Sequence, residues 1–301
     1  MERGWLSSNN IVLHGDTPED GAILIDTGYA SHAPQTLALI ASALQPGEGI
    51  RLLANTHLHS DHCGGNASVS ARYGCPIWIP PGEFDAASIW DETRLSYRAT
   101  GQQCDRFEPT GKLLPGDVLR QGGNEWHIHA APGHDPHSVI LFEPQSRTLL
   151  SADALWERGF GIVFPELDGE AAFEDLAATL DLIDSLEPLL VVPGHGSPFN
   201  DVRGSLGIAR QRLDYFRSEP ARHAAHAAKA LTVFHVLEIR ETSQDELIAW
   251  LLQTPVLLST WRRFFTSIDP GDWAEQLIAE LVAARVLDAS DPLGTLRATA
   301  S

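Results

Sequence analysis

The heptapeptide at residues 56–62, Thr-His-Leu-His-Ser-Asp-His, constrains this chain more than any other stretch. It holds three imidazoles and one carboxylate within seven residues, a density that is typical of metal ligands. The apolar run Ile50–Ala54 before it predicts a buried strand, and the glycines after it predict a tight turn into a helix. We therefore expect a metal-binding loop at a strand end. The alternative is a solvated polar loop, which has no reason to be so rich in histidine.

Other polar residues also follow apolar runs directly. The five positions of this kind are Asp26, His57, His134, Asp153 and His195. The runs before them, such as Ala22–Ile25 and Leu189–Val192, predict buried strands. Strand ends at one edge of a sheet form a rigid, convergent platform, so we expect one cluster built from distant segments.

Length and charge limit the classes of protein to which the chain can belong. Its 301 residues can hold a core domain of about two hundred residues and a smaller one. A net charge of −19 argues against general affinity for nucleic acid or anionic membranes, because both need a basic face. Three cysteines are too few and too odd in number for a disulfide framework, and neither a secretory signal nor a membrane-spanning run is visible. We expect a cytoplasmic protein.

Periodicity predicts the remaining elements. Helical spacing predicts helices over residues 34–44, 67–73, 170–186, 224–239, 243–252 and 273–286. Apolar runs predict strands over residues 11–13, 76–79 and 125–130 and a β-hairpin over 139–150, while a loose helical stripe over 83–107 predicts a helical insertion near the site. Beyond about residue 215 strand-like runs stop and alanine and leucine rise. We expect two domains, at residues 1–215 and 216–301. The second is expected to be small and mostly helical, and to serve as a lid, to mediate dimerisation or to contribute to the substrate pocket.

The pattern His-x-His-x-Asp-His, followed by His134, Asp153 and His195 in separate loops, resembles the metallo-β-lactamase-fold hydrolases over about residues 10–200. The strand end at Asp26 and the turn after His62 are similar to the hydroxyacylglutathione-hydrolase (glyoxalase II) branch and its thioesterase and lactonase relatives. The resemblance implies an α/β fold, an αββα sandwich of two mixed sheets faced by helices.

The resemblance also implies seven metal ligands. The first ion would be held by His57, His59 and His134, the second by Asp61, His62 and His195, with Asp153 bridging the two. Asp26 would orient a liganding histidine through its other ring nitrogen. Two divalent ions about 3.5–4 Å apart share a water and lower its pKa, and the hydroxide attacks an ester, thioester or lactam carbonyl. Asp61 and Asp153 are the expected catalytic carboxylates, and zinc the expected metal, with iron or manganese as alternatives.

Four residues near these ligands are candidates for the substrate pocket. Trp156 and Phe160, and Phe164 after them, form an apolar wall or belong to the core. His137 lines the pocket or supports a ligand; the family often has a histidine one place further on, where this chain has Ser138.

Four other histidines and the three cysteines are expected to have no part in the site. The pair His127 and His129 precedes the ligand loop and is expected to be structural. Cys63 is expected to be a packed thiol, and Cys75 and Cys104 to be inert, without a partner. The remaining pair, His223 and His226, is expected at the surface.

We expect a dinuclear metal-dependent hydrolase that acts on an ester, thioester or lactone of a small molecule. A phosphodiesterase or ribonuclease of the same fold is the alternative, since the C-terminal helices resemble a winged-helix module; their acidic balance disfavours nucleic acid and favours a lid or a homodimer contact. A β-lactamase is disfavoured because no signal peptide is visible. A non-catalytic binding module would have lost ligand positions, and all seven are present.

Overall fold

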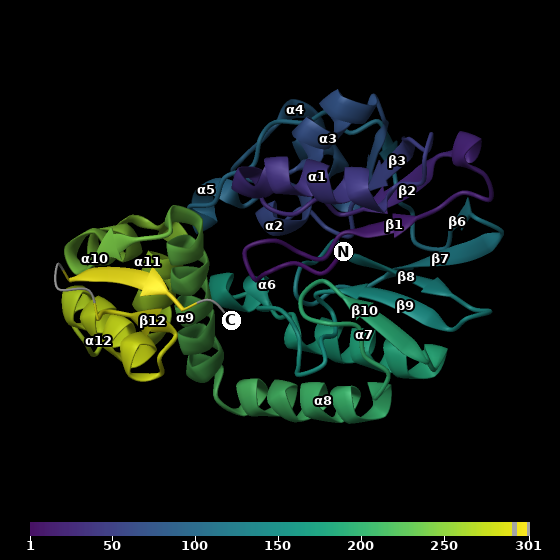
Figure 1. Ribbon diagram of the computed structural model, residues 1–301. Coiled ribbons are helices and arrows are strands. Elements are labelled where there is room, and N and C mark those ends of the chain that lie inside the picture. Colours follow the sequence, from purple (N-terminus) through teal and green to yellow (C-terminus); the bar gives the residue numbers. More distant parts are fainter. Residues whose placement is uncertain (291–293, 300–301) are drawn as a thin grey trace. The chain divides into compact units, whose positions relative to one another are not determined.

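The computed structural model describes residues 1–290 and 294–299, and the chain divides into two compact units (Figure 1). The first unit consists of Met1–Tyr97, Gln103–Glu166 and Ala171–Asp214. The second consists of Arg98–Gln102, Leu167–Glu170 and Tyr215–Ser301. Two short segments from the middle of the chain thus belong with the C-terminal part.

The first unit contains two five-stranded mixed sheets. One has the order β1 (Ile11–Leu13), β2 (Ala22–Ile25), β3 (Ile50–Ala54), β4 (Ile77–Ile79) and β5 (Gly111–Lys112). The other has the order β10 (Leu190–Pro193), β9 (Thr148–Ala152), β8 (Val139–Glu143), β7 (Asn124–Ala130) and β6 (Val118–Gln121). The first is parallel except for β1–β2, and the second is antiparallel except for β9–β10. The predicted strands and the hairpin are confirmed.

The layers follow from the alternation of side chains along buried strands. In β2, Ile23 and Ile25 join a core with Trp126 and Leu141 of the other sheet. Ala22 and Leu24 of the same strand point the other way, into a core shared with helices. A strand that is apolar on both faces needs cover on both, so each sheet has the other on one face and helices on the other. This is the predicted αββα order.

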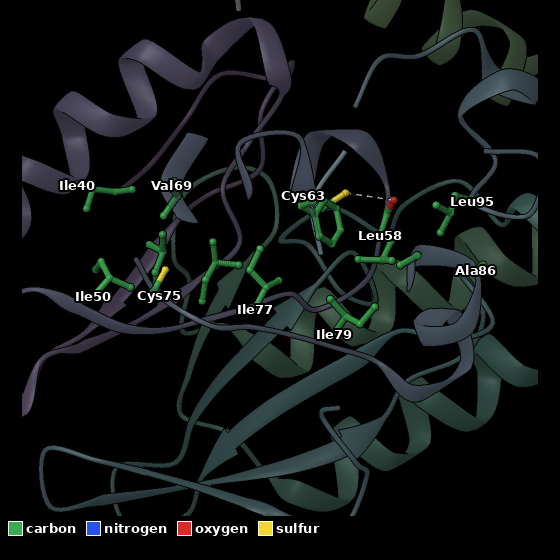
Figure 2. Packing of buried hydrophobic residues seen from close by; sticks show 14 of the residues in the cluster. Ile40, Ile50, Leu58, Cys63, Val69, Cys75, Ile77, Ile79, Ala86 and Leu95 are labelled. Carbon is green, nitrogen blue, oxygen red and sulfur yellow. Dashed lines mark hydrogen bonds between the residues drawn. The ribbon is translucent and has the colours of Figure 1, made fainter. Parts of the chain in front are cut away.

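Figure 2 shows part of the outer core, where Ile40 and Val69 pack with Ile50 and Ile77 of the sheet. Ile40 lies on α1 (Ala33–Ala43) and Val69 on α3 (Asn66–Tyr73), the two helices that cover this sheet (Figure 1). The second sheet is faced by α7 (Phe173–Leu186), which begins three residues later than predicted. It ends at Leu186, because Glu187 adopts a left-handed conformation with φ of 47° and the following Pro188 cannot continue a helix.

The predicted helical insertion is only partly helical. Residues 83–107 contain α4 (Phe84–Ile89) and α5 (Tyr97–Thr100), joined by turns. Trp90 ends α4 with φ of 58°, a left-handed conformation that stops the helix. The loose periodicity of this segment therefore reflects two short helices.

Among the described residues, the C-terminal part of the second unit contains four complete helices and a small sheet. The helices are α9 (Pro220–Ile239), α10 (Gln244–Gln253), α11 (Pro255–Phe264) and α12 (Pro270–Ala283). The antiparallel strands are ordered β11 (Thr242–Ser243), β13 (Thr295–Ala298) and β12 (Leu287–Asp288). The prediction that strands stop beyond residue 215 was wrong, because strands of two to four residues are too short to show an alternating pattern.

Local signals in this unit have mixed outcomes. The helix predicted over residues 243–252 begins with a capping box, since Ser243 Oγ accepts from the Glu246 N–H at 3.2 Å and Glu246 accepts from the Ser243 N–H at 3.0 Å. His223 is not at the surface: it is 2% exposed, with its ring 5.1 Å from that of Phe216. An alanine-rich helix gives no contrast between its faces, so the pattern alone placed His223 wrongly. No helix among the described residues is long and apolar enough to cross a membrane.

Candidate metal centre

The strand ends of the first unit bring the predicted ligands together. β2 and β3 run parallel, so Asp26 and His57 leave the same edge of one sheet. β9 and β10 also run parallel, so Asp153 and His195 leave one edge of the other. The motif itself turns into α2 (Ser60–Cys63) and then α3.

Seven side chains form two neighbouring groups. The first contains His57, His59 and His134, and the second contains Asp61, His62, Asp153 and His195. Within each group the ligand atoms lie within 4.8 Å of one another. All except His59, which is half-buried, are buried. The division matches the two sets predicted from the sequence, with Asp153 in the second.

Hydrogen bonds to one ring nitrogen leave the other facing the centre. His134 Nδ1 lies 2.5 Å from the Ile162 carbonyl, and its Nε2 lies 2.8 Å from His59 Nδ1. His62 Nδ1 lies 2.8 Å from Asp26 Oδ2, while His62 Nε2 is 3.5 Å from Asp153 Oδ1. This is how a second residue fixes the orientation of a metal-ligating histidine.

Two of the inward nitrogens are left without hydrogen bonds. His57 Nε2 and His62 Nε2 are buried and have no hydrogen-bond partner among the described residues. Leaving such groups unpaired costs about 1–3 kcal/mol each, so they need another partner. Nitrogen and carboxylate donors converging from all sides suit divalent transition-metal ions. The residues present therefore fit two divalent cations, one in each group.

Asp26 holds this arrangement from behind. It is buried and has a φ of 57°, a left-handed conformation that aspartate tolerates better than most residues. Its carboxylate accepts from the Thr56 backbone N–H at 2.9 Å and the Thr56 hydroxyl at 2.8 Å, besides contacting His62. One carboxylate thus positions both the start of the motif loop and a ligand.

Burial sets the protonation of the first group. It is the main cause of the pKa of His57 lying well below 6.5 and of the pKa of His134 falling to about 4, with the neighbouring histidines adding to it. Both imidazoles are neutral at neutral pH, as a metal ligand must be.

In the second group the charges of the neighbours outweigh burial. Burial alone would raise the pKa of Asp61 and Asp153, but His62 and His195 hold both below their usual value. Burial would lower the pKa of His62, yet Asp153, Asp26 and Asp61 raise it well above 6.5. A cation bound here would displace the His62 proton, because a ligating imidazole must be neutral.

These shifts predict a stability maximum near pH 6.5 for the protein without metal. Because the pKa of His134 is about 4 when folded and 6.5 when unfolded, the unfolded state binds more protons between these values, so stability falls as pH drops. His57 acts in the same direction. His62 acts oppositely: its contribution is full below 6.5 and is lost as pH rises through its raised folded pKa.

The measurement is the midpoint of urea-induced unfolding, taken in the presence of a metal chelator from about pH 5 to about pH 8. His134→Gln should flatten the acid side of the profile and His62→Gln the alkaline side. A profile that neither variant changes would contradict the prediction.

Aromatic residues border both groups. Phe164, at the start of α6 (Phe164–Asp168), lies 4.8 Å from the His59 ring and 5.7 Å from the His134 ring, centre to centre. Trp156 lies 5.5 Å from the His195 ring, and its Nε1 donates to Asp153 Oδ1 at 3.2 Å. Phe160 is buried with the Arg212 guanidinium 5.4 Å over its ring, so it belongs to the core instead of a pocket wall.

The other candidates lie outside the two groups. His137 is exposed and packs on Gly82, where an added Cβ would lie 2.2 Å from its ring. His127 and His129 lie on β7, before the ligand loop. Cys104 has a neighbour, contrary to the prediction: its sulfur is 3.7 Å from that of Cys63, because residues 103–107 fold back against α2.

Three residues near the site were not predicted from the sequence. Trp5 stacks on the His195 ring from the N-terminal segment. Asp135 is buried with Oδ2 3.7 Å from His59 Nε2. Glu83, in a 3₁₀ turn (Pro81–Glu83), has a pKa raised well above 4.5 by burial and by Asp135. Of the three, only Asp135 adjoins a predicted ligand in the sequence, and that proximity was the one signal that could have identified it.

Trp156→Phe is expected to weaken metal binding by about 10–100-fold, the usual cost of losing a residue that orients a ligand. Phenylalanine keeps the ring but removes the donor to Asp153 Oδ1. Titration against a competing chromophoric chelator measures the affinity. Phe160→Leu, a change in the core behind the site, is the control; equal affinities for Trp156→Phe and the unaltered protein would contradict the expectation.

Comparisons with known proteins agree with this geometry. The model of the metallo-beta-lactamase superfamily matches residues 3–195. The chain is 30% identical over 132 residues to a hydroxyacylglutathione hydrolase of Rhodopseudomonas palustris (strain HaA2), spanning 44% of this chain and 44% of that protein. It is 23% identical over 198 residues to hydroxyacylglutathione hydrolase GloC of Haemophilus influenzae, spanning 62% of this chain and 85% of that protein.

Solved structures share the fold. A metallo-beta-lactamase family protein from Thermus thermophilus matches with a TM-score of 0.55 at 18% identity, over 97% of this chain and 94% of that one. A protein solved in a di-iron-bound form matches with a TM-score of 0.53 at 26% identity, over 69% of this chain and 94% of that one. The second match spans about as many residues as the first unit contains.

Proposed function

Because the chain belongs to the metallo-β-lactamase superfamily and is a metal-dependent hydrolase, we propose that it hydrolyses a thioester of a small molecule at a two-metal centre. Esters and lactones are the related substrates that the same centre would accept. The relatives named hydroxyacylglutathione hydrolase support the thioester. The match to the Rhodopseudomonas protein spans less than half of that protein's length, so its substrate is not carried over.

One observation carries the proposal: seven ligand side chains form two buried groups, with unpaired nitrogens turned inward. A binding module that had abandoned catalysis would be free to lose ligands or to pair them internally. Keeping His57 Nε2 and His62 Nε2 unpaired is costly unless they hold ions.

Two bound divalent ions would supply Lewis acids that activate water and polarise the scissile carbonyl. The side chains do the rest. His57, His59 and His134 would hold one ion, and Asp61, His62 and His195 the other, with Asp153 between them. Asp61, whose pKa is lowered by His62 and His195, stays ionised, and its Oδ2 would accept a hydrogen bond from the attacking water and orient that water.

We propose zinc as the native metal, because mixed imidazole and carboxylate ligands suit it. Iron and manganese fit the same donors. The relative solved in a di-iron-bound form supports keeping iron in the test.

The partner that we propose is a small molecule. The exposed side of α12 carries Asp272, Glu275 and Glu280, which repel phosphate backbones. We assign the second unit a lid or homodimer role, and to the whole chain a cytoplasmic location.

The test is a substrate panel with enzyme loaded with zinc, iron or manganese: thioesters, lactones, phosphodiesters and β-lactams. Thioesters should give the highest kcat/KM, and Asp61→Asn, which replaces a charged ligand of the second group by a neutral one, should remove most of it and lower the metal content. Preference for a phosphodiester, or no turnover of any carbonyl substrate by fully loaded enzyme, would overturn the proposal.

A further inference from the structure

The N-terminal segment is fastened to the loops that carry the ligands. The Ser8 N–H donates to the Asp61 carbonyl at 2.9 Å, and the Asn9 N–H donates to the Gly194 carbonyl at 2.6 Å. The Asn9 side-chain amide donates to the carbonyls of Pro193 and Gly196 at 3.0 and 2.7 Å. Residues 7–10 are all polar and all buried. Their hydrogen bonds therefore hold the segment in one position beside the second group.

This segment presents Trp5 at the rim of the site. The indole stacks on the His195 ring with centroids 5.3 Å apart and planes within 9° of parallel. Its edge meets Trp156, with centroids 5.4 Å apart and planes at 66°. Trp156 in turn meets His195 at 5.5 Å and 72°. The three rings form a corner, which we call the Trp5 corner, and its inner side is a metal-ligand histidine.

Trp5 nevertheless leaves 47% of its surface exposed. Its stacking uses one ring face, and buried hydrogen bonds hold the backbone that carries it. An apolar ring that is held rigidly and is half exposed next to a reactive centre is typical of a ligand-binding surface. A ligand that covers the exposed part of the ring gains the free energy of burying that apolar surface. Tryptophan also binds with little loss of side-chain freedom, since only two torsions are fixed.

We infer that Trp5 is a specificity-determining residue that selects substrates with a planar, uncharged aromatic group. The aromatic ring of the substrate would pack on the exposed surface of Trp5, on the side of the centre formed by Asp61 and His195. The inference rests on the proposed function and adds the chemical class of the group beside the scissile carbonyl. It assigns no part in bond cleavage to Trp5, which donates nothing to the ligand carboxylates in the described contacts.

The test uses two thioesters with the same leaving thiol, the phenylacetyl and acetyl derivatives of N-acetylcysteamine. Trp5→Ala should lower the ratio of kcat/KM for phenylacetyl over acetyl by about tenfold, the worth of one aromatic contact with its buried area. The loss should lie in KM for the phenylacetyl substrate. Trp5→Phe should recover most of the ratio, since it restores a flat apolar face.

The matched control is Leu189→Ala. Leu189 is an exposed apolar residue of the same unit, next to the end of β10 opposite His195. It should leave the ratio unchanged. Metal content and melting temperature measured on every variant separate substrate selection from damage to the centre, because a merely structural Trp5 would change both substrates alike.

Binding of phenylacetate to the metal-loaded protein, compared with acetate by calorimetry, does not depend on turnover. Weaker phenylacetate binding by Trp5→Ala with unchanged acetate binding supports the inference even if neither thioester is cleaved, a result that would overturn only the proposed function. If wild-type enzyme cleaves both thioesters and Trp5→Ala keeps both the ratio and the phenylacetate affinity, the inference is wrong and the hydrolase proposal stands.

Discussion

Asp153→Asn is expected to lower kcat/KM for the best substrate by at least about a thousandfold, and to reduce the metal content below two ions per chain. The loss of a Lewis acid removes several kcal/mol of transition-state stabilisation, and each 1.36 kcal/mol is a factor of ten. Asp153 reaches both groups: its Oδ1 is 3.5 Å from His62 Nε2 and its Oδ2 is 3.4 Å from His134 Nε2. Asparagine keeps the shape but offers one neutral oxygen.

The measurements are steady-state kinetics and elemental analysis of the purified variant. Asp181→Asn is the control, since Asp181 is an exposed carboxylate of α7 that pairs with Arg210 at 2.8 Å. It should change neither quantity. Two bound ions and activity within tenfold of the unaltered enzyme in Asp153→Asn would show that this residue does not bridge the centre.

Gly194→Ala is expected to cost about a hundredfold or more in kcat/KM although it adds one methyl group. A Cβ at Gly194 would lie 2.1 Å from Asp153 Oδ1 and 3.0 Å from both His62 Cε1 and the Ala152 carbonyl carbon. The carboxylate would have to move by about 1 Å, a misplacement that can reduce the rate of a preorganised site a hundredfold. The backbone cannot yield instead, because the Gly194 carbonyl accepts from the Asn9 N–H at 2.6 Å.

Gly207→Ala is the matched control for this substitution. Gly207 lies in α8 (Val202–Ser218), and a Cβ added there would have nothing within 4 Å, so alanine should raise stability by up to about 1 kcal/mol and leave activity unchanged. Metal content and a cooperative melting curve for Gly194→Ala distinguish a displaced ligand from an unfolded chain. Full activity in Gly194→Ala would mean that Asp153 is free to move without loss.

Much of the fold and of the candidate centre could be predicted because the signals are local. Apolar runs such as Ala22–Ile25 end at a polar residue, and the parallel pairing of neighbouring strands brings such ends together. The amphipathic stripe of α7 and the capping box at Ser243 are also short-range patterns. Which oxygen or nitrogen faces inward could not be predicted, because hydrogen bonds such as His134 Nδ1 to Ile162 join residues far apart in the chain.

The residues that the sequence did not reveal depend on long-range packing. No sequence pattern around Trp5 indicates a place beside the site. It lies there because its segment is hydrogen-bonded to the loops of Asp61 and Gly194. Cys104 meets Cys63 only after a fold-back of the chain. The strands β11 and β13 of the second unit pair through residues about fifty apart in the chain, as in Thr242 with Leu296. The sequence around either strand therefore does not indicate its partner.

The spread of the ligands along the chain has a consequence for the order of folding. The first motif histidine is His57 and the last ligand is His195, which directly follows β10, the strand at the edge of the second sheet. The second group is incomplete until β10 has paired with β9. A partly folded chain should therefore bind the second ion hardly better than the unfolded chain does. Contacts this distant in sequence form late and slowly. Uptake of the second ion should therefore report, in a refolding experiment, the moment at which the whole first unit is assembled.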